Sequence, residues 1–232
     1  MQQHSNSYTL RYAIFFTTAV AIVLAVLASG LRPMQERNIA QAKRAAILQS
    51  VMEVNKETLE SDYNSYITEY VYALDGTEKV DEAAFDIEIR KQVKLADEER
   101  SFPLYVYNRD GETRFIIPLE GKGLWGPITA YLALDSNLNT ISGVVFEHEK
   151  ETPGLGAEIS MPMFEDRYDG KELFNDGGEF VSVRALKGSG NAINSDHEVD
   201  GLTGATMTLN GVNAMMTDEL ALYENILVSI KS

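Results

Sequence analysis

The residues that could do chemistry are concentrated in the segment 200–208, DGLTGATMT. Thr206 places a hydroxyl group directly after Gly204 and Ala205, whose small side chains leave space for another molecule to reach it. An apolar pattern with helical spacing begins directly after this segment. A threonine in this position either caps the helix by accepting a backbone hydrogen bond or serves as an attachment point for another group.

The helix predicted after Thr208 favours a negatively charged group at this position. Its apolar residues recur every three or four positions, at Leu209, Val212, Met216, Leu220, Tyr223, Leu227 and Ile230. The first N–H groups of a helix have no partner inside it and carry partial positive charge, so they stabilise a phosphate. A phosphoester on Thr206 would lie near that end, and Thr208 could then cap the helix.

Two earlier segments contain glycines in loop-like sequences. Residues 151–156, ETPGLG, follow an expected strand, and their Pro-Gly pair is typical of a turn. Residues 121–126, GKGLWG, lack the spacing and the Lys-Ser/Thr ending of a phosphate-binding loop. They contain Trp125, the single tryptophan of the chain, which either anchors the core or contacts a ligand.

The three segments together resemble a known family. The motif D-x-x-[ST]-G-A-[ST], found in proteins that carry flavin mononucleotide (FMN) on a phosphoester bond to threonine, is matched by Asp200, Thr203, Gly204, Ala205 and Thr206. With GKGLWG, ETPGLG and an apolar N-terminal segment before this motif, the chain resembles the NqrC family of the sodium-translocating NADH:quinone reductases. The RnfG family of the Rnf complexes, which shares the anchor and the flavin threonine, is the alternative. The run GLWGPITAYLALD favours NqrC.

The resemblance implies a set of FMN-binding residues around the carrier threonine. The loop 151–156 packs along the isoalloxazine ring and its ribityl chain, with a hydrogen bond from Thr152, Leu155 covering the ring and Gly156 admitting the backbone. Trp125 stacks on the ring or lies at its edge. The complete set consists of Thr206, Thr203, Gly204, Ala205, Asp200, Glu151, Thr152, Leu155, Gly156, Trp125 and Lys187. It includes no catalytic residue and no metal ligand.

Two charged residues of this set have alternative explanations. Lys187 either offsets the phosphate charge, hydrogen-bonds the N1/O2 edge of the ring, or is a solvated surface lysine. Asp200 either fixes its loop by accepting backbone N–H bonds or serves the enzyme that attaches the flavin.

The composition excludes several other kinds of site. The formal net charge of -15, with 35 acidic and 20 basic residues, argues against binding nucleic acid or an anionic membrane surface. The absence of cysteine removes disulfides and cysteine-ligated iron–sulfur clusters. The three histidines, His4, His148 and His197, have no metal-like spacing. Redox chemistry in this chain therefore requires an organic cofactor.

An uncharged apolar segment, residues 12–31, lies near the N-terminus. Its length matches the roughly 20 residues that cross a bilayer as a helix. A cleaved signal peptide has a shorter apolar region of about 7–15 residues. The small residues around Ala28 could imitate a cleavage site, but one permanent anchor in contact with membrane lipid is favoured.

The charges that flank this segment conflict with the resemblance. Basic residues usually mark the cytoplasmic side. Only Arg11 precedes the segment, whereas Arg32, Arg37, Lys43 and Arg44 follow it. This count places the large domain inside the cell. The resemblance implies a periplasmic domain on a bacterial inner membrane, and we follow the resemblance because a short tail and a long acidic domain test the charge rule poorly.

The remaining pattern predicts an α+β fold, in which an antiparallel sheet with flanking helices forms the FMN-binding domain. Two hairpins are predicted, one between 104–107 and 114–117 and one between 128–134 and 141–146. Residues 85–89 and 180–186 alternate like strands, and 34–56 have helical spacing. The expected organisation is a tail, a transmembrane helix, a helical stalk and one domain, over residues 1–11, 12–31, 32–57 and 58–232.

The resemblance implies an electron relay in place of independent substrate turnover. In such a complex the covalent FMN passes electrons onward as they move from NADH to quinone and sodium is pumped. A separate flavin transferase attaches FMN from FAD with the help of magnesium. A cofactor-free, membrane-anchored binding or scaffold domain is the alternative from another class, and it predicts a colourless protein.

Overall fold

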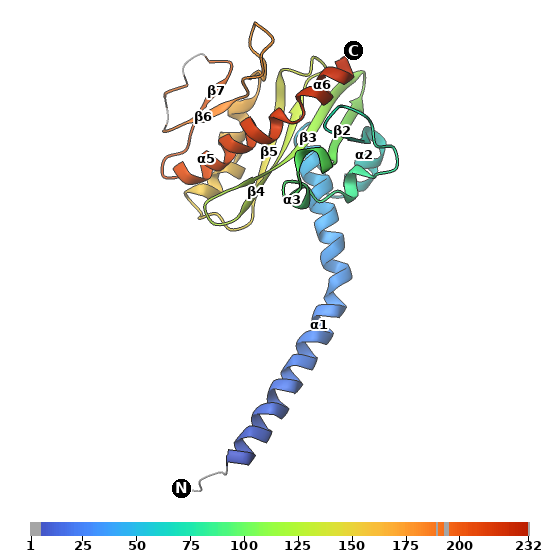
Figure 1. Cartoon of the computed structure of the whole chain (residues 1–232), viewed down its shortest axis with the longest axis vertical. Helices are drawn as coiled ribbons and strands as arrows, with labels where there is room; N and C mark the ends of the chain where they lie inside the picture. Colours follow the sequence, from blue (N-terminus) through green and yellow to red (C-terminus); the bar gives the residue numbers. More distant parts are fainter. Residues whose placement is uncertain (1–5, 189, 193–194, 232) are drawn as a thin grey trace. The chain divides into compact units, whose positions relative to one another are not determined.

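The computed structural model describes residues 6–188, 190–192 and 195–231 (Figure 1). The first five residues of the predicted tail, with His4 among them, lie outside the described residues. The chain divides into two compact units, Met1–Lys43 and Arg44–Ser232.

The first unit is the greater part of helix α1 (Asn6–Gln49). Its side chains are exposed along the apolar segment, and α1 is the one helix among the described residues that is long and apolar enough to cross a membrane. The helix begins before Tyr12 and continues through Pro33. The predicted membrane helix and stalk are therefore parts of one continuous helix.

The last turn of α1 belongs to the second unit, where Ala46, Ile47 and Leu48 are buried. The helix ends at Gln49, so the helical prediction was wrong for 50–56. After the helix ends, the backbone is held by a side chain of the sheet, because Arg114 donates to the Val51 carbonyl at 3.0 Å.

The second unit contains a five-stranded antiparallel sheet in the order β1-β2-β3-β4-β5. The strands are β1 (Ile67–Tyr72), β2 (Phe102–Arg109), β3 (Glu112–Lys122), β4 (Pro127–Leu134) and β5 (Ile141–His148). Both predicted hairpins, β2-β3 and β4-β5, are confirmed. The first turns at Asp110 and Gly111, which both have positive φ, of 52° and 87°. Such a pair suits the right-handed twist of a two-residue hairpin.

Each face of this sheet packs against a separate core. Along β4, Ile128, Ala130 and Leu132 point into one core, while Tyr131 and Ala133 point into the other. This alternation is the ordinary period of a strand. The first core is covered by α5 (Thr206–Ala214) and α6 (Glu224–Lys231), which lie across the sheet in Figure 1. The second core includes the end of α1 and α2 (Leu59–Tyr66). The α+β prediction is therefore confirmed.

Two of the predicted strands differ from the structure. Residues Ala84–Asp86 form a 3₁₀ turn and Ile89–Gln92 form α3, so the strand over 85–89 was wrong. The Glu69 carboxylate accepts the Phe85 N–H at 2.8 Å, which takes this backbone out of strand pairing. From the predicted strand 180–186 only β6 (Arg184–Leu186) forms, paired in parallel with β7 (Glu198–Asp200).

The C-terminal helix is interrupted, although its apolar pattern was read correctly. After α5, residues Met215–Glu219 form a π-helical segment, and α6 begins at Glu224. The predicted positions Leu209, Val212, Met216, Leu220, Tyr223 and Leu227 are all buried. The short helix α4 (Pro162–Glu165) completes the unit. The burial pattern therefore survives a local change in helical geometry.

Candidate functional site

Thr206 is the first residue of α5, and its side chain is exposed. The cap position is Ala205, which has no side chain capable of capping, so the alternative in which Thr206 caps the helix was wrong. The Leu209 N–H donates to the Ala205 carbonyl at 2.9 Å. The N–H groups before it have no acceptor within the helix. The Thr206 hydroxyl therefore lies beside the free amide groups of a helix N-terminus.

The residues before Thr206 leave its approach open. Thr203 and Gly204 are exposed, whereas Ala205 is buried. Gly204 has a φ of +81°, a conformation that favours glycine, and a Cβ there would lie 2.6 Å from Leu155 Cδ2. The loop 151–156 is thereby placed directly against the threonine motif.

A single buried carboxylate joins all three sequence segments. Glu151, which is 5 % exposed, accepts the Trp125 N–H at 2.8 Å and the Thr208 hydroxyl at 2.6 Å. The prediction that Thr208 caps the helix was wrong, because its hydroxyl donates to Glu151 instead. Burial raises the pKa of Glu151, but the hydrogen bonds from Thr208, Trp125 and Gly126 outweigh it and hold the pKa below its ordinary value.

Two glycines of the motifs make room for this carboxylate. A Cβ on Gly123 would lie 2.5 Å from Glu151 Oε1. A Cβ on Gly156 would overlap both Glu151 Oε2 and the Thr208 hydroxyl oxygen. The structure thus gives Gly156 a requirement that the sequence did not indicate, separate from its predicted contact with a flavin.

Three apolar side chains of the motif segments are exposed. Trp125 is 64 % exposed, so the alternative in which it anchors the core was wrong. Leu155 is 43 % and Met207 is 59 % exposed. Thr152 is also exposed, and its carbonyl accepts the Leu155 N–H at 3.1 Å. These side chains are available to a flat apolar ring.

Asp200 fixes the loop that precedes the motif, which is the first of the two roles considered for it. Its carboxylate accepts the N–H groups of Gly190, Asn191 and Ala192 at 2.7, 2.8 and 2.9 Å. These hydrogen bonds lower the pKa of Asp200, with that from Ala192 contributing most. Lys187 is exposed, and its carbonyl accepts the Asn191 side chain at 2.7 Å.

Sequence reasoning missed Arg167. Its guanidinium donates to the carbonyls of Asp200 at 2.6 Å, Gly201 at 3.0 Å and Met163 at 2.8 Å. This side chain ties the segment after α4 to the start of the threonine motif. No spacing or composition signal marked it, because all its acceptors are backbone carbonyls.

Comparisons with known proteins agree with this geometry. The sequence profile of the FMN-binding domain matches residues 123–221, a range that contains every predicted FMN-binding residue. NqrC of the Na(+)-translocating NADH-quinone reductase from Vibrio parahaemolyticus is 31% identical, over 88% of this chain and 86% of its own length. The chain belongs to the NqrC family. The corresponding protein from Neisseria meningitidis is 30% identical, over 90% of this chain and 87% of its own length.

Solved structures of the same family share the fold. The crystal structure of NqrC from Parabacteroides distasonis is 38% identical and superposes with a TM-score of 0.77, covering 85% of this chain and 96% of its own. Shewanella oneidensis NqrC is 25% identical, with a TM-score of 0.73, and covers 83% of this chain and 97% of its own. Membership of the NqrC family therefore decides against the Rnf alternative.

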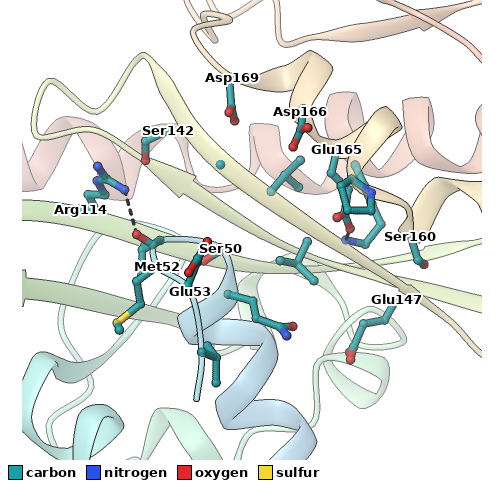
Figure 2. A pocket seen from close by; sticks show the side chains of 18 residues that line it. Ser50, Met52, Glu53, Arg114, Ser142, Glu147, Ser160, Glu165, Asp166 and Asp169 are labelled. Atoms are coloured by element: carbon teal, nitrogen blue, oxygen red, sulfur yellow. Dashed lines mark hydrogen bonds between the residues drawn. The ribbon is translucent and has the colours of Figure 1, made fainter. Parts of the chain in front are cut away.

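A cavity in the second unit is lined by none of the predicted FMN-binding residues (Figure 2). Its volume is about 870 Å³. Its ionisable lining residues are Arg114, Glu53, Glu147, Glu165, Asp166 and Asp169. Burial raises the pKa of Glu165 to about 7 and also raises the pKa of Glu147 and Asp169. Because carboxylates repel a phosphate, this cavity does not suit FMN.

Proposed function

We propose that this chain is the FMN-carrying electron-transfer subunit of a sodium-translocating NADH:quinone reductase, with FMN attached to Thr206 through a phosphoester. One observation carries the proposal. The Thr206 hydroxyl is exposed at the first position of α5, behind Gly204 and Ala205, in a chain of the NqrC family. A phosphate bound there lies next to the free amides of the helix N-terminus, which favours it electrostatically.

The attachment step consumes FAD and releases AMP. The Thr206 oxygen forms a bond to the FMN phosphorus of FAD while the bond between that phosphorus and the bridging pyrophosphate oxygen breaks. AMP leaves with the bridging oxygen, and a base of the separate flavin transferase takes the hydroxyl proton. A magnesium ion held by the transferase would act as a Lewis acid and assist the phosphoryl transfer. Thr206 acts as a nucleophile in this step only.

Once attached, FMN supplies the electron-transfer chemistry, and the chain binds and orients it. Leu155, Trp125 and Met207 offer apolar contacts to the ring, and Lys187 supplies a positive charge before the motif. Hydrogen bonds and charge near a flavin tune its potential. The partners in this function are the other subunits of the complex, and no independent turnover is expected.

We further propose that α1 anchors the chain in a bacterial inner membrane with the FMN domain on the periplasmic side. The length and composition of α1 support the anchor. A covalent bond suits that side of the membrane, because a dissociated flavin could not be replaced from a cytoplasmic pool. Insertion as a single pass leaves the domain outside the bilayer.

The test is to produce the full chain with a flavin transferase and an export route, beside Thr206→Ala and Thr206→Ser variants. Wild type and Thr206→Ser, which keeps a hydroxyl, are expected to show flavin fluorescence on a denaturing gel, and Thr206→Ala none. The Tm of all three should agree closely, because Thr206 is exposed and the cap position is Ala205. Covalent flavin on a folded Thr206→Ala chain would overturn the proposed carrier.

A further inference from the structure

We propose that Glu151 and Thr208 form a positioning pair, which holds the first turn of α5 so that the Thr206 hydroxyl faces the incoming flavin donor before any flavin is attached. This inference rests on the proposed function of Thr206. It gives Glu151 a role different from direct contact with the cofactor. Glu151 is a positioning residue, because its carboxylate is buried and its hydrogen bonds go to the protein.

The two oxygens of the Glu151 carboxylate bind two different segments of the chain. Oε1 accepts the Trp125 N–H from the loop after β3, and Oε2 accepts the Thr208 hydroxyl from α5. Thr208 lies 57 positions from Glu151 in the sequence, and Trp125 lies 26 positions away. One side chain thus fixes the distance between the exposed tryptophan and the helix that carries Thr206.

The side chains of Thr206 and Thr208 point to nearly opposite sides of α5. Successive residues of an α-helix are turned by about 100°, so Thr206 and Thr208 are about 200° apart around α5. Thr208 is 1 % exposed and points inward to Glu151. The hydrogen bond that draws Thr208 inward therefore turns Thr206 outward, where its side chain is exposed.

Close packing holds both the Glu151 carboxylate and the helix α5 in place. Gly123 and Gly156 pack directly on the Glu151 carboxylate. One turn further along α5, a Cβ on Gly211 would overlap the Lys122 carbonyl at the end of β3. The helix is therefore held at its first turn by the Thr208 hydrogen bond and at its middle by close packing on β3.

Removing the Thr208 hydroxyl should loosen the first turn selectively. Thr208→Val keeps the shape of the side chain but leaves one Glu151 oxygen buried without its donor, which is unfavourable for a charged group. A shift of the first turn that exposes this oxygen to water becomes favourable, while the middle of α5 stays packed against β3. The surface that a transferase recognises is otherwise unchanged.

The experiment measures flavin transfer to the apo full chain in detergent, with purified transferase, FAD and Mg²⁺. Initial rates are recorded against the concentration of the chain. For Thr208→Val we expect the maximal rate to fall about tenfold or more while the KM for the chain stays within about twofold, because a misplaced nucleophile slows the reaction without weakening recognition. Thr208→Ser, which keeps the donor, should stay within about twofold of wild type.

A matched control is Thr217→Val. Thr217 lies further along the same helical segment, and its hydroxyl donates to the Asn213 carbonyl at 2.9 Å without reaching Glu151. This variant should transfer flavin at the wild-type rate. Thr208→Val combined with Glu151→Ala should fall no further than the lower single variant, because both remove the same interaction.

The outcomes separate this inference from the function on which it rests. If the wild-type chain accepts no flavin, the proposed function fails. If the wild type accepts flavin and folded Thr208→Val does so at the wild-type rate, the positioning pair is overturned. If Thr208→Val does not fold, Glu151→Asp decides, since its shorter side chain keeps the charge but cannot reach both Trp125 and Thr208. A wild-type rate in folded Glu151→Asp also overturns the pair.

Discussion

The surroundings of Thr206 and the acidic cavity of Figure 2 differ in shape and in charge. Thr206 is exposed at the N-terminus of α5, and Trp125, Leu155 and Met207 of the motif segments are exposed as well. The cavity is roomy and carries five carboxylates against a single arginine. Volume alone would choose the cavity. Charge and attachment chemistry favour Thr206 for the proposed phosphoester, since that bond needs a nucleophile and the phosphate is favoured by the positive end of a helix.

The difference extends to what holds each region together. At the Thr206 site, Glu151 and Asp200 are ionised carboxylates whose partners lower their pKa values. In the cavity, burial raises the pKa of Glu165 because its donors do not outweigh the loss of solvent. Carboxylates therefore accept the hydrogen bonds that hold the first region, whereas burial dominates at Glu165 in the second.

The largest effect is expected for Gly156→Ala. The added methyl group overlaps the Glu151 carboxylate and the Thr208 hydroxyl, so unfolding should be easier by about 1–3 kcal/mol. Flavin incorporation should fall as well, because the same group displaces the first turn of α5. Denaturant unfolding and flavin fluorescence measure the two effects.

The control for Gly156→Ala is Gly178→Ala. Gly178 has a φ of +79°, and no atom of the described residues lies near the place that an added methyl group would take. Alanine there costs about 1–2 kcal/mol of backbone strain alone. It should lose stability without losing flavin. Equal flavin incorporation in both variants would mean that overlap at Gly156 does not disturb the site.

A smaller effect is expected for Arg167→Leu. This variant removes the donors to the carbonyls of Asp200, Gly201 and Met163, and should cost about 1–2 kcal/mol. Flavin incorporation should be slower, because the start of the motif is no longer held. Arg109→Leu, at an exposed turn, should cost less than about 1 kcal/mol and leave incorporation unchanged. Wild-type incorporation by folded Arg167→Leu would remove it from the site.

The smallest effect is expected for Glu165→Gln in the cavity. The folded chain holds a proton on Glu165 up to about pH 7, whereas the unfolded chain releases it near pH 4.5, so this group makes the protein less stable as pH rises through that window. Glutamine should remove the loss and raise the Tm at pH 8 by about 2–4 °C, after allowance for partial exposure.

Thermal unfolding at pH 5 and pH 8 measures the effect of Glu165→Gln. The variant and the wild type should differ at pH 8 and agree more closely at pH 5. Flavin incorporation should be unchanged at both values. A variant that loses flavin would connect the cavity with the Thr206 site and contradict their separation.

Local patterns predicted much of the fold. The hairpin between 104–107 and 114–117 was predictable because its turn contains Asp110 and Gly111, residue types that tolerate the positive φ values found there. The apolar spacing from Leu209 onward identified a buried helical face, although the π segment at Met215–Glu219 has no signal in that spacing. Residues 85–89 were misread, because the Glu69 side chain holds the Phe85 N–H from outside the segment.

The residues of the candidate site were named from the sequence, but the contacts that join them were not. The motif at Thr206 and the loop 151–156 were both recognised from the sequence. The hydrogen bond from Thr208 to Glu151 crosses 57 positions and depends on the packing of α5 on the sheet, so no local pattern contains it. Arg167 could not be identified from the sequence either, because its acceptors are backbone carbonyls, which every residue provides.

The intact mass of the denatured full chain, produced with a flavin transferase and an export route, tests the central claim most directly. The account predicts an added mass equal to FMN less one water, located on the peptide that contains Thr206. An unmodified chain in a host that flavinylates a known NqrC would contradict it. That result would favour a membrane-anchored domain without a cofactor.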